Sequence, residues 1–173
     1  MIKFLLKFFK SLNANAHPGD IAHAVSLGLL LALVPKGNLM WPFLFALTFF
    51  IRMNKGAFFL SLILLSFVIP FIDIPVEQFG YYMLSLDYLN PIYITLYQIP
   101  FVGLTRFNNT MVAGSFYIGI LSYLPTYILI RFAILGYRKK LQPMIINSKA
   151  YKVFNRLPLI KMIRNVANLG GAK

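Results

Sequence analysis

A run of 20 residues, Met111–Ile130, contains no charged side chain and ends at Arg131. As an α-helix this run would be about 30 Å long, which is the thickness of the hydrocarbon core of a bilayer. Three shorter apolar runs precede it, at residues 21–34, 39–51 and 57–72. Only 12% of the residues are charged, whereas a soluble domain has about 25%. The sequence therefore predicts an all-α, polytopic integral membrane protein.

The first two apolar runs contain 14 and 13 residues, so each would reach only about 20 Å as a helix. The turn sequence between them contains Pro35 and Gly37. We predict a re-entrant helical hairpin over residues 21–51 with these two residues in its turn; two short, tilted spans are the alternative. The clearer transmembrane helices are predicted at residues 57–72 and 111–135, the first with tilt or local thinning of the bilayer.

The charged residues predict an orientation in the membrane. Three of the four acidic residues, but a single basic residue, fall between residues 73 and 109. From residue 136 onward there are nine basic residues and no acidic ones. Basic residues collect on the cytoplasmic side of membrane proteins. We therefore expect a multi-pass protein of the bacterial inner membrane, with both termini cytoplasmic and residues 73–109 periplasmic.

Amphipathic segments flank the predicted spans. Residues 1–12 place their lysines on one helical face, which predicts a basic interfacial helix; a signal peptide cleaved near residues 14–16 is the alternative. Residues 73–109 are rich in aromatic residues, as interfacial segments are. Residues 138–173 are predicted to form a basic amphipathic cytoplasmic tail, which would lie on anionic lipid or dock onto a partner protein. Residues 1–137 form the membrane domain.

Small residues recur at every fourth position in two of the predicted helices. This spacing lets helix backbones approach closely in lipid. We expect these residues to pack helices within the chain, with pairing of two copies in a homo-oligomer as the alternative. The residues are Ala24, Gly28, Ala32, Ser115 and Gly119.

The densest polar group near the predicted membrane precedes the longest apolar run. It contains Arg106, Asn108, Asn109 and Thr110. One interpretation is structural: an Asn or Thr caps the following helix, and Arg106 extends to the membrane interface. The functional interpretation is a phospholipid-headgroup site, because a guanidinium and free helix N–H groups both bind phosphate.

Two histidines and one carboxylate have the spacing of possible metal ligands. However, Pro18 and Gly19 lie between His17 and Asp20 and prevent these residues and His23 from sharing one helical face. Asp20 is instead predicted to be the N-cap of a helix that begins at residue 21. We expect no metal and no cofactor.

Enzymatic activity and nucleic-acid binding are also not expected. The sequence contains no cysteine, no nucleophile motif and no closely spaced pair of acidic residues. The net charge of +13 could suggest nucleic acid, but the basic residues flank apolar runs instead of following a polar face.

Several stretches resemble a family of small bacterial membrane proteins, domain of unknown function family 2062. These are Ala22–Val34 with the Pro-Lys-Gly that follows, and Phe43–Arg52 with Asn54. A subfamily is indicated by Leu12–Pro18 and by Leu104–Thr110 with Gly114-Ser115. The resemblance covers roughly residues 1–137. In that subfamily an acidic residue usually stands where this chain has His17, which argues against a role for this position.

The resemblance implies a location and a partner rather than a reaction. The family has no established activity, and its subfamily occurs in bacteria with outer membranes, often encoded beside a large AsmA-like envelope protein. We therefore expect a non-catalytic inner-membrane subunit of an envelope complex that supplies phospholipid to a periplasmic bridge-like lipid carrier. A small self-contained transporter or lipid-scrambling unit, and a purely structural assembly factor, are the alternatives.

Overall fold

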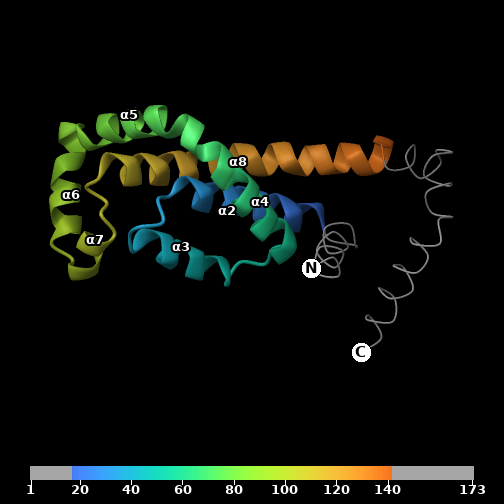
Figure 1. Ribbon diagram of the computed structural model, residues 1–173, viewed down its shortest axis with the longest axis horizontal. Helices are drawn as coiled ribbons and strands as arrows, with labels where there is room; N and C mark the ends of the chain where they lie inside the picture. Colours follow the sequence, from blue (N-terminus) through green and yellow to red (C-terminus); the bar gives the residue numbers. More distant parts are fainter. Residues whose placement is uncertain (1–16, 142–173) are drawn as a thin grey trace.

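The computed structural model describes residues 17–141, and within this range the chain forms helices and turns but no strand (Figure 1). The all-α prediction is thus confirmed for these residues. The predicted interfacial helix at residues 1–12, and all of the basic tail from residue 142 onward, lie outside the described range. The α-helices are α2 (Pro18–Leu33), α3 (Met40–Thr48), α4 (Lys55–Val68), α5 (Asp73–Leu84), α6 (Asn90–Tyr97), α7 (Pro100–Leu104) and α8 (Thr110–Gly136). Shorter helical turns are η1 (Ile69–Ile72), η2 (Asp87–Leu89) and η3 (Tyr137–Leu141).

Helix α8 lies along the length of the described part of the chain (Figure 1). Its 27 residues correspond to a length of about 40 Å. Helix α2 packs against it in the antiparallel direction, so that His23 lies beside Tyr123 and Leu30 beside Gly119. Helix α4 packs on another side of α2, and α5 packs on the N-terminal part of α8.

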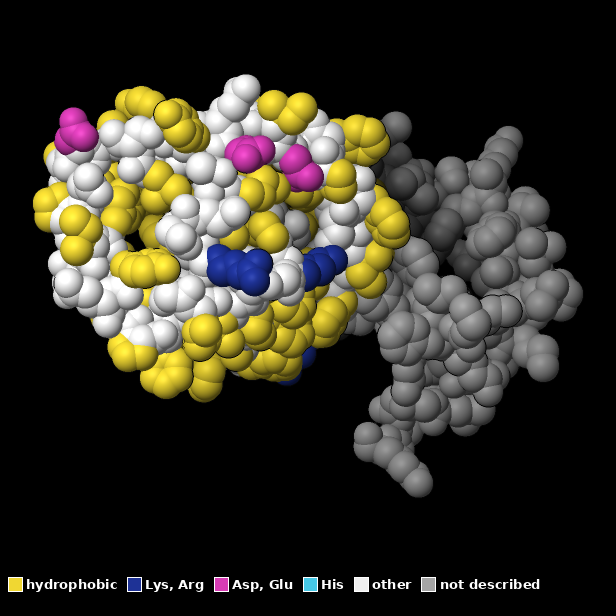
Figure 2. Space-filling model, turned by 60° about the vertical axis from the view of Figure 1, so that its left-hand side comes forward, with side chains coloured by type: hydrophobic (Ala, Val, Ile, Leu, Met, Phe, Trp, Pro, Cys, Tyr) yellow, Lys and Arg dark blue, Asp and Glu magenta, His cyan; other side chains and the backbone are white. Residues whose placement is uncertain are grey.

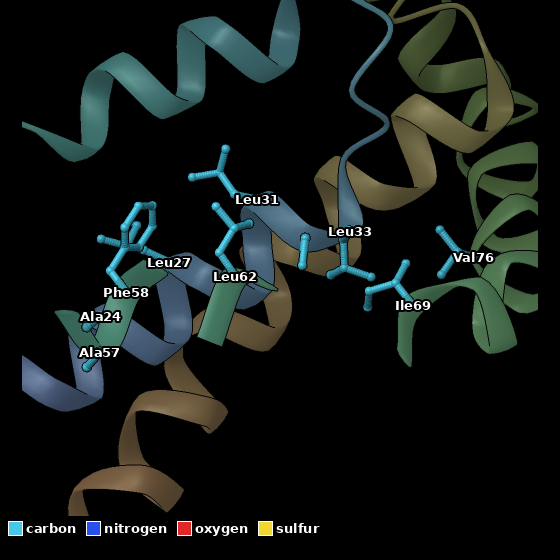
Figure 3. Packing of buried hydrophobic residues seen from close by; sticks show 10 residues of the cluster. Ala24, Leu27, Leu31, Leu33, Ala57, Phe58, Leu62, Ile69 and Val76 are labelled. Atoms are coloured by element: carbon cyan, nitrogen blue, oxygen red, sulfur yellow. The ribbon is translucent and has the colours of Figure 1, made fainter. Parts of the chain in front are cut away.

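The core lies mainly between α2 and α4 (Figure 3). Leu31 and Phe58 are fully buried there. Gly28 allows the close approach of the two helices, because a Cβ at this position would overlap the hydroxyl oxygen of Ser61. The Ser61 hydroxyl donates a hydrogen bond to the Ala24 carbonyl oxygen (3.3 Å). All five small residues of the helix-packing prediction are buried.

The α2–α3 segment reverses direction at residues 34–39. The Asn38 side chain closes the turn, donating to the Pro35 carbonyl oxygen (3.0 Å) and accepting from the Trp41 amide (3.2 Å). At the opposite end, the Asn54 amide donates to the Asp20 carbonyl oxygen (3.1 Å). The chain therefore runs out along α2 and returns to the start of that helix at Asn54; the re-entrant placement of this segment in a membrane stays a prediction.

The predicted N-cap of α2 was wrong. The helix begins at Pro18, and His17 is its N-cap, with Nδ1 accepting a hydrogen bond from the Gly19 amide (3.2 Å). Asp20 lies in the first turn. Proline suits the first helical position because its missing N–H would have no partner there and its φ is already helical.

The predicted span at residues 57–72 is part of a longer helical stretch, Lys55–Leu84. Helices α4 and α5 differ in direction within this stretch (Figure 1). Pro70 lies in the η1 turn at the change of direction. A proline there removes one backbone donor and its ring crowds the preceding turn, which bends a helix.

The α5–α8 crossing brings two backbones into direct contact. A Cβ at Gly80 would overlap the Thr110 carbonyl oxygen, and a Cβ at Gly114 would overlap the Val76 carbonyl oxygen. Hence both positions require glycine for packing. This crossing fixes the start of α8 against α5.

Two helical stretches, Lys55–Leu84 and Thr110–Lys140, are long and apolar enough to cross a membrane. Within their most apolar parts, only 22% and 6% of the residues are buried. A core helix of a soluble protein would be mostly buried, whereas here large side chains such as Phe132 and Leu121 are exposed. These helices therefore present apolar surface outward.

Candidate functional site

Three segments that are distant in sequence meet at one end of the described structure. They are the hairpin turn (residues 34–39), the end of α7 and the segment that enters α8. The Leu39 amide donates a hydrogen bond to the Leu104 carbonyl oxygen (3.2 Å), which joins the turn to α7. Two adjoining cavities of about 640 and 210 Å³ lie here, and both are lined by Gly37, Asn38 and Arg106. We call the two cavities together the tip groove.

The walls of the tip groove are apolar and its charged groups are basic. Its larger part is also lined by Lys36, Leu39, Trp41, Pro42, Gly103 and Leu104, and its smaller part by Pro35, Asn109, Met111 and Val112. No acidic residue is among these lining residues. Figure 2 brings this end forward and shows basic side chains near the middle of the face, with hydrophobic side chains below and acidic ones above.

The two basic side chains are available to a ligand. Both Lys36 and Arg106 are exposed. The Lys36 ammonium lies 3.5 Å from the Ser66 hydroxyl oxygen, at the limit of a hydrogen bond. Within residues 17–141, the Arg106 guanidinium has no hydrogen-bond or ion-pair partner. The groove therefore holds two positive charges with no counter-charge on its walls.

The backbone at Arg106 has an unusual conformation. Its φ is 55°. Among the non-glycine residues that the structure describes, Arg106 alone has a positive φ. An L-residue in this left-handed region is sterically disfavoured, and such positions cluster at functional sites. Two hydrogen bonds hold the turn: the Arg106 amide donates to the Gly103 carbonyl oxygen (3.2 Å), and its own carbonyl accepts from Asn109 (2.9 Å).

Asn109 is the N-cap of α8. Its Oδ1 accepts hydrogen bonds from the amides of Met111 (3.0 Å) and Val112 (3.2 Å). These two amides already donate to Asn109. They are therefore not free to bind a phosphate, as the hypothesis of a headgroup site at the start of α8 required. The tip groove instead depends on side-chain cations.

The other two residues of the predicted headgroup site, Thr110 and Asn108, lie outside the groove. The Thr110 hydroxyl donates to the Glu77 carboxylate (3.3 Å), so it faces α5. Asn108 is exposed and makes no side-chain hydrogen bond within residues 17–141. Neither lines the tip groove. Sequence reasoning missed Lys36 and Asn38, although a charged residue in the turn of an otherwise apolar hairpin was a usable signal.

Aromatic packing positions the segment that carries Arg106. The Phe107 ring lies 5.6 Å from the Phe116 ring and 5.8 Å from the Tyr117 ring, measured between centroids. The Tyr93 hydroxyl lies 3.0 Å from the Tyr117 hydroxyl and donates to the Met83 carbonyl oxygen (3.1 Å). This cluster ties α6 to α8 directly behind the tip groove.

The histidines have structural partners. His17 caps α2, and His23 Nδ1 lies 2.6 Å from the Tyr123 hydroxyl in α8. Within residues 17–141 no three His, Cys, Asp or Glu side chains are grouped as metal ligands.

The cap gives a direct prediction. Replacing Asn109 with alanine leaves two amides at the start of α8 without their side-chain acceptor, and should lower the free energy of unfolding by about 0.5–2 kcal/mol. Asn108→Ala, one residue away and without such a bond, is the matched control and should leave it unchanged. Thermal unfolding in detergent measures both; equal loss in the two variants would contradict the assignment of the cap.

A protein of Treponema pallidum (strain Nichols), described as an uncharacterized protein, is 47% identical to this chain over 161 residues. The alignment covers 93% of this chain and 99% of the relative. No family model matches the chain, and no solved structure matches it. The resemblance to family 2062 thus stays a prediction.

Proposed function

This chain belongs to the family of the Treponema pallidum protein, and we propose that it is a non-catalytic subunit of an envelope complex in the bacterial inner membrane. Its tip groove binds the phosphate of a phospholipid headgroup. The complex uses this subunit to supply phospholipid to a periplasmic carrier, and the partner is a larger envelope protein of the AsmA type. The choice of partner rests on the family resemblance of the sequence.

The observation that carries the proposal is the pairing of Lys36 and Arg106 in a groove without acidic lining residues. A guanidinium offers phosphate two parallel hydrogen bonds, and an ammonium adds a compact point charge. Trp41 and Leu104 supply apolar walls next to these cations. A phospholipid has the same combination of an anionic phosphate beside apolar chains.

Helix α8 supports the proposed placement in the membrane. The uncharged run at residues 111–130 is about 30 Å long as a helix, and it separates Arg106 from Arg131. Arg138, Lys139 and Lys140 follow at the same end as Arg131. By the preference of basic residues for the cytoplasm, that end is cytoplasmic and the tip groove is at the outer interface. The hairpin enters from the cytoplasmic side and its turn reaches this groove.

Lipid retention tests the binding role. The wild-type chain, purified in mild detergent, should retain phospholipid in native mass spectrometry. Arg106→Gln should reduce retained phospholipid several-fold without unfolding the protein, and Arg106→Lys should restore it only in part because an ammonium lacks the planar fork. Arg131→Gln, at the opposite end of α8, is the control. Unchanged retention in Arg106→Gln would overturn the headgroup site.

Labelling of single introduced cysteines tests the orientation in the membrane. The sequence contains no cysteine, so only the introduced residue reacts. In intact cells with a permeable outer membrane, an impermeant thiol reagent should label Ser85→Cys and leave Lys140→Cys unlabelled. Asn38→Cys should label more weakly than Ser85→Cys, because Asn38 is half-buried and, in the proposed re-entrant arrangement, lies in the interface layer and not in the periplasm. Equal labelling of Asn38→Cys and Ser85→Cys would favour two short spans. Labelling of Lys140→Cys but not of Ser85→Cys would overturn the orientation.

A further inference from the structure

We propose that the tip groove selects lipids with a terminal phosphomonoester, such as phosphatidic acid, over lipids whose phosphate is a diester. This inference rests on the proposed lipid site and adds the class of headgroup that it takes. It starts from the charges on the groove walls. Lys36 and Arg106 contribute two positive charges, and the acidic residue next to this segment, Glu77, accepts a hydrogen bond from Thr110 on the side that faces α5.

Charge balance favours a dianion. A phosphodiester carries a single negative charge, so it would leave one of the two cations without a counter-charge. A zwitterionic headgroup would also bring its own ammonium close to Lys36 and Arg106. A phosphomonoester carries about −1.5 to −2 charges at pH 7, which matches the two cations of the groove.

The arrangement of the two cations also favours a terminal phosphate. Lys36 lies on the hairpin turn, and Arg106 lies on the segment between α7 and α8. The Leu39–Leu104 backbone hydrogen bond fixes these two segments side by side. If both cations contact one phosphate, a bidentate guanidinium occupies two of its oxygens and the ammonium needs a third. A monoester presents three terminal oxygens, whereas a diester presents two.

The groove is uncrowded at its two lining glycines. Gly37 and Gly103 both line its larger part, and a Cβ built at either would have no atom within 4 Å. The positive φ of Arg106 holds an arginine at a position where glycine would cost less. The backbone conformation therefore does not explain the presence of an arginine at this position.

A competition experiment tests the selectivity. The full-length protein is incorporated into nanodiscs with equal amounts of phosphatidic acid, phosphatidylglycerol and phosphatidylethanolamine, and the lipids that remain bound after extraction are counted by native mass spectrometry. Phosphatidic acid should exceed phosphatidylglycerol by about tenfold, the effect of one additional charge-assisted hydrogen bond. Lys36→Gln should bring this ratio close to one, while Arg106→Gln should reduce the retention of both lipids several-fold.

The outcomes separate the two proposals. A wild-type ratio near one, with lipid still lost in Arg106→Gln, would overturn the monoester selectivity and leave the lipid site intact. Lipid retention that is independent of both Lys36 and Arg106 would overturn both. Inorganic phosphate at the same concentration should not displace phosphatidic acid, because it lacks the acyl chains that the apolar walls contact; displacement would overturn the assignment of a lipid as the ligand.

Discussion

Gly80→Ala and Gly114→Ala are expected to destabilise the protein more than alanine at any other glycine in the described part of the chain. At each position the added Cβ would overlap a backbone carbonyl oxygen of the opposite helix, so α5 and α8 would have to separate. Overpacking of this kind costs about 1–3 kcal/mol when side chains can adjust. Backbone atoms cannot move aside, so we expect a loss of about 3 kcal/mol or more, measured as unfolding in detergent.

Gly136→Ala is the matched control for this crossing. Gly136 is also a helical glycine of α8, but a Cβ there would have no atom within 4 Å. Alanine has the higher helix propensity, so this variant should gain up to about 1 kcal/mol. If Gly80→Ala and Gly136→Ala unfolded at the same midpoint, the α5–α8 contact would not exist as described.

Arg106→Gly is expected to abolish lipid retention while leaving stability almost unchanged. Glycine adopts a φ of 55° without a steric penalty, which relieves a cost of about 1–2 kcal/mol for an L-residue. The greater freedom of glycine in the unfolded chain offsets part of this gain. We therefore expect the free energy of unfolding to stay within about 1 kcal/mol of wild type, and retained phospholipid to fall by about tenfold or more.

Arg106→Asn supplies the second measurement, because asparagine also tolerates the left-handed region. It should behave as the glycine variant does, folded but depleted of lipid. If either variant kept its lipid, Arg106 would be only an interfacial anchor. If both lost stability by several kcal/mol, the side chain would have a packing role that the exposed guanidinium does not show.

The local elements were predictable because each is bounded by a charge or a turn residue. The turn between α2 and α3 follows from two short apolar runs that are separated by Pro35 and Gly37. The long helix α8 follows from the uncharged run before Arg131. Asn109 was one of three candidates for its cap, and only the geometry of the turn after Arg106 selects it. Pro18 marks the start of α2, and the prediction of Asp20 as the N-cap overlooked it.

The contacts between distant segments were not predictable. Gly80 belongs to a segment whose aromatic residues indicated an interfacial location, and nothing in its own surroundings identifies Gly114 as its partner. Lys36 and Arg106 likewise lie in unrelated sequence contexts, and each alone is an ordinary interfacial base. They line one groove because the hairpin turn bonds to the end of α7 through Leu39 and Leu104.

Photochemical cross-linking maps the bound lipid directly. A phospholipid with a diazirine close to its phosphate is added to the wild-type protein in nanodiscs, and the cross-linked peptides are identified after irradiation. Cross-links should concentrate in the segments 36–42 and 103–109, which contain most of the residues that line the tip groove, and should disappear in Arg106→Gln. Cross-links spread evenly along the exposed face of α8, or concentrated near residues 131–140, would contradict a headgroup site at this end of the protein.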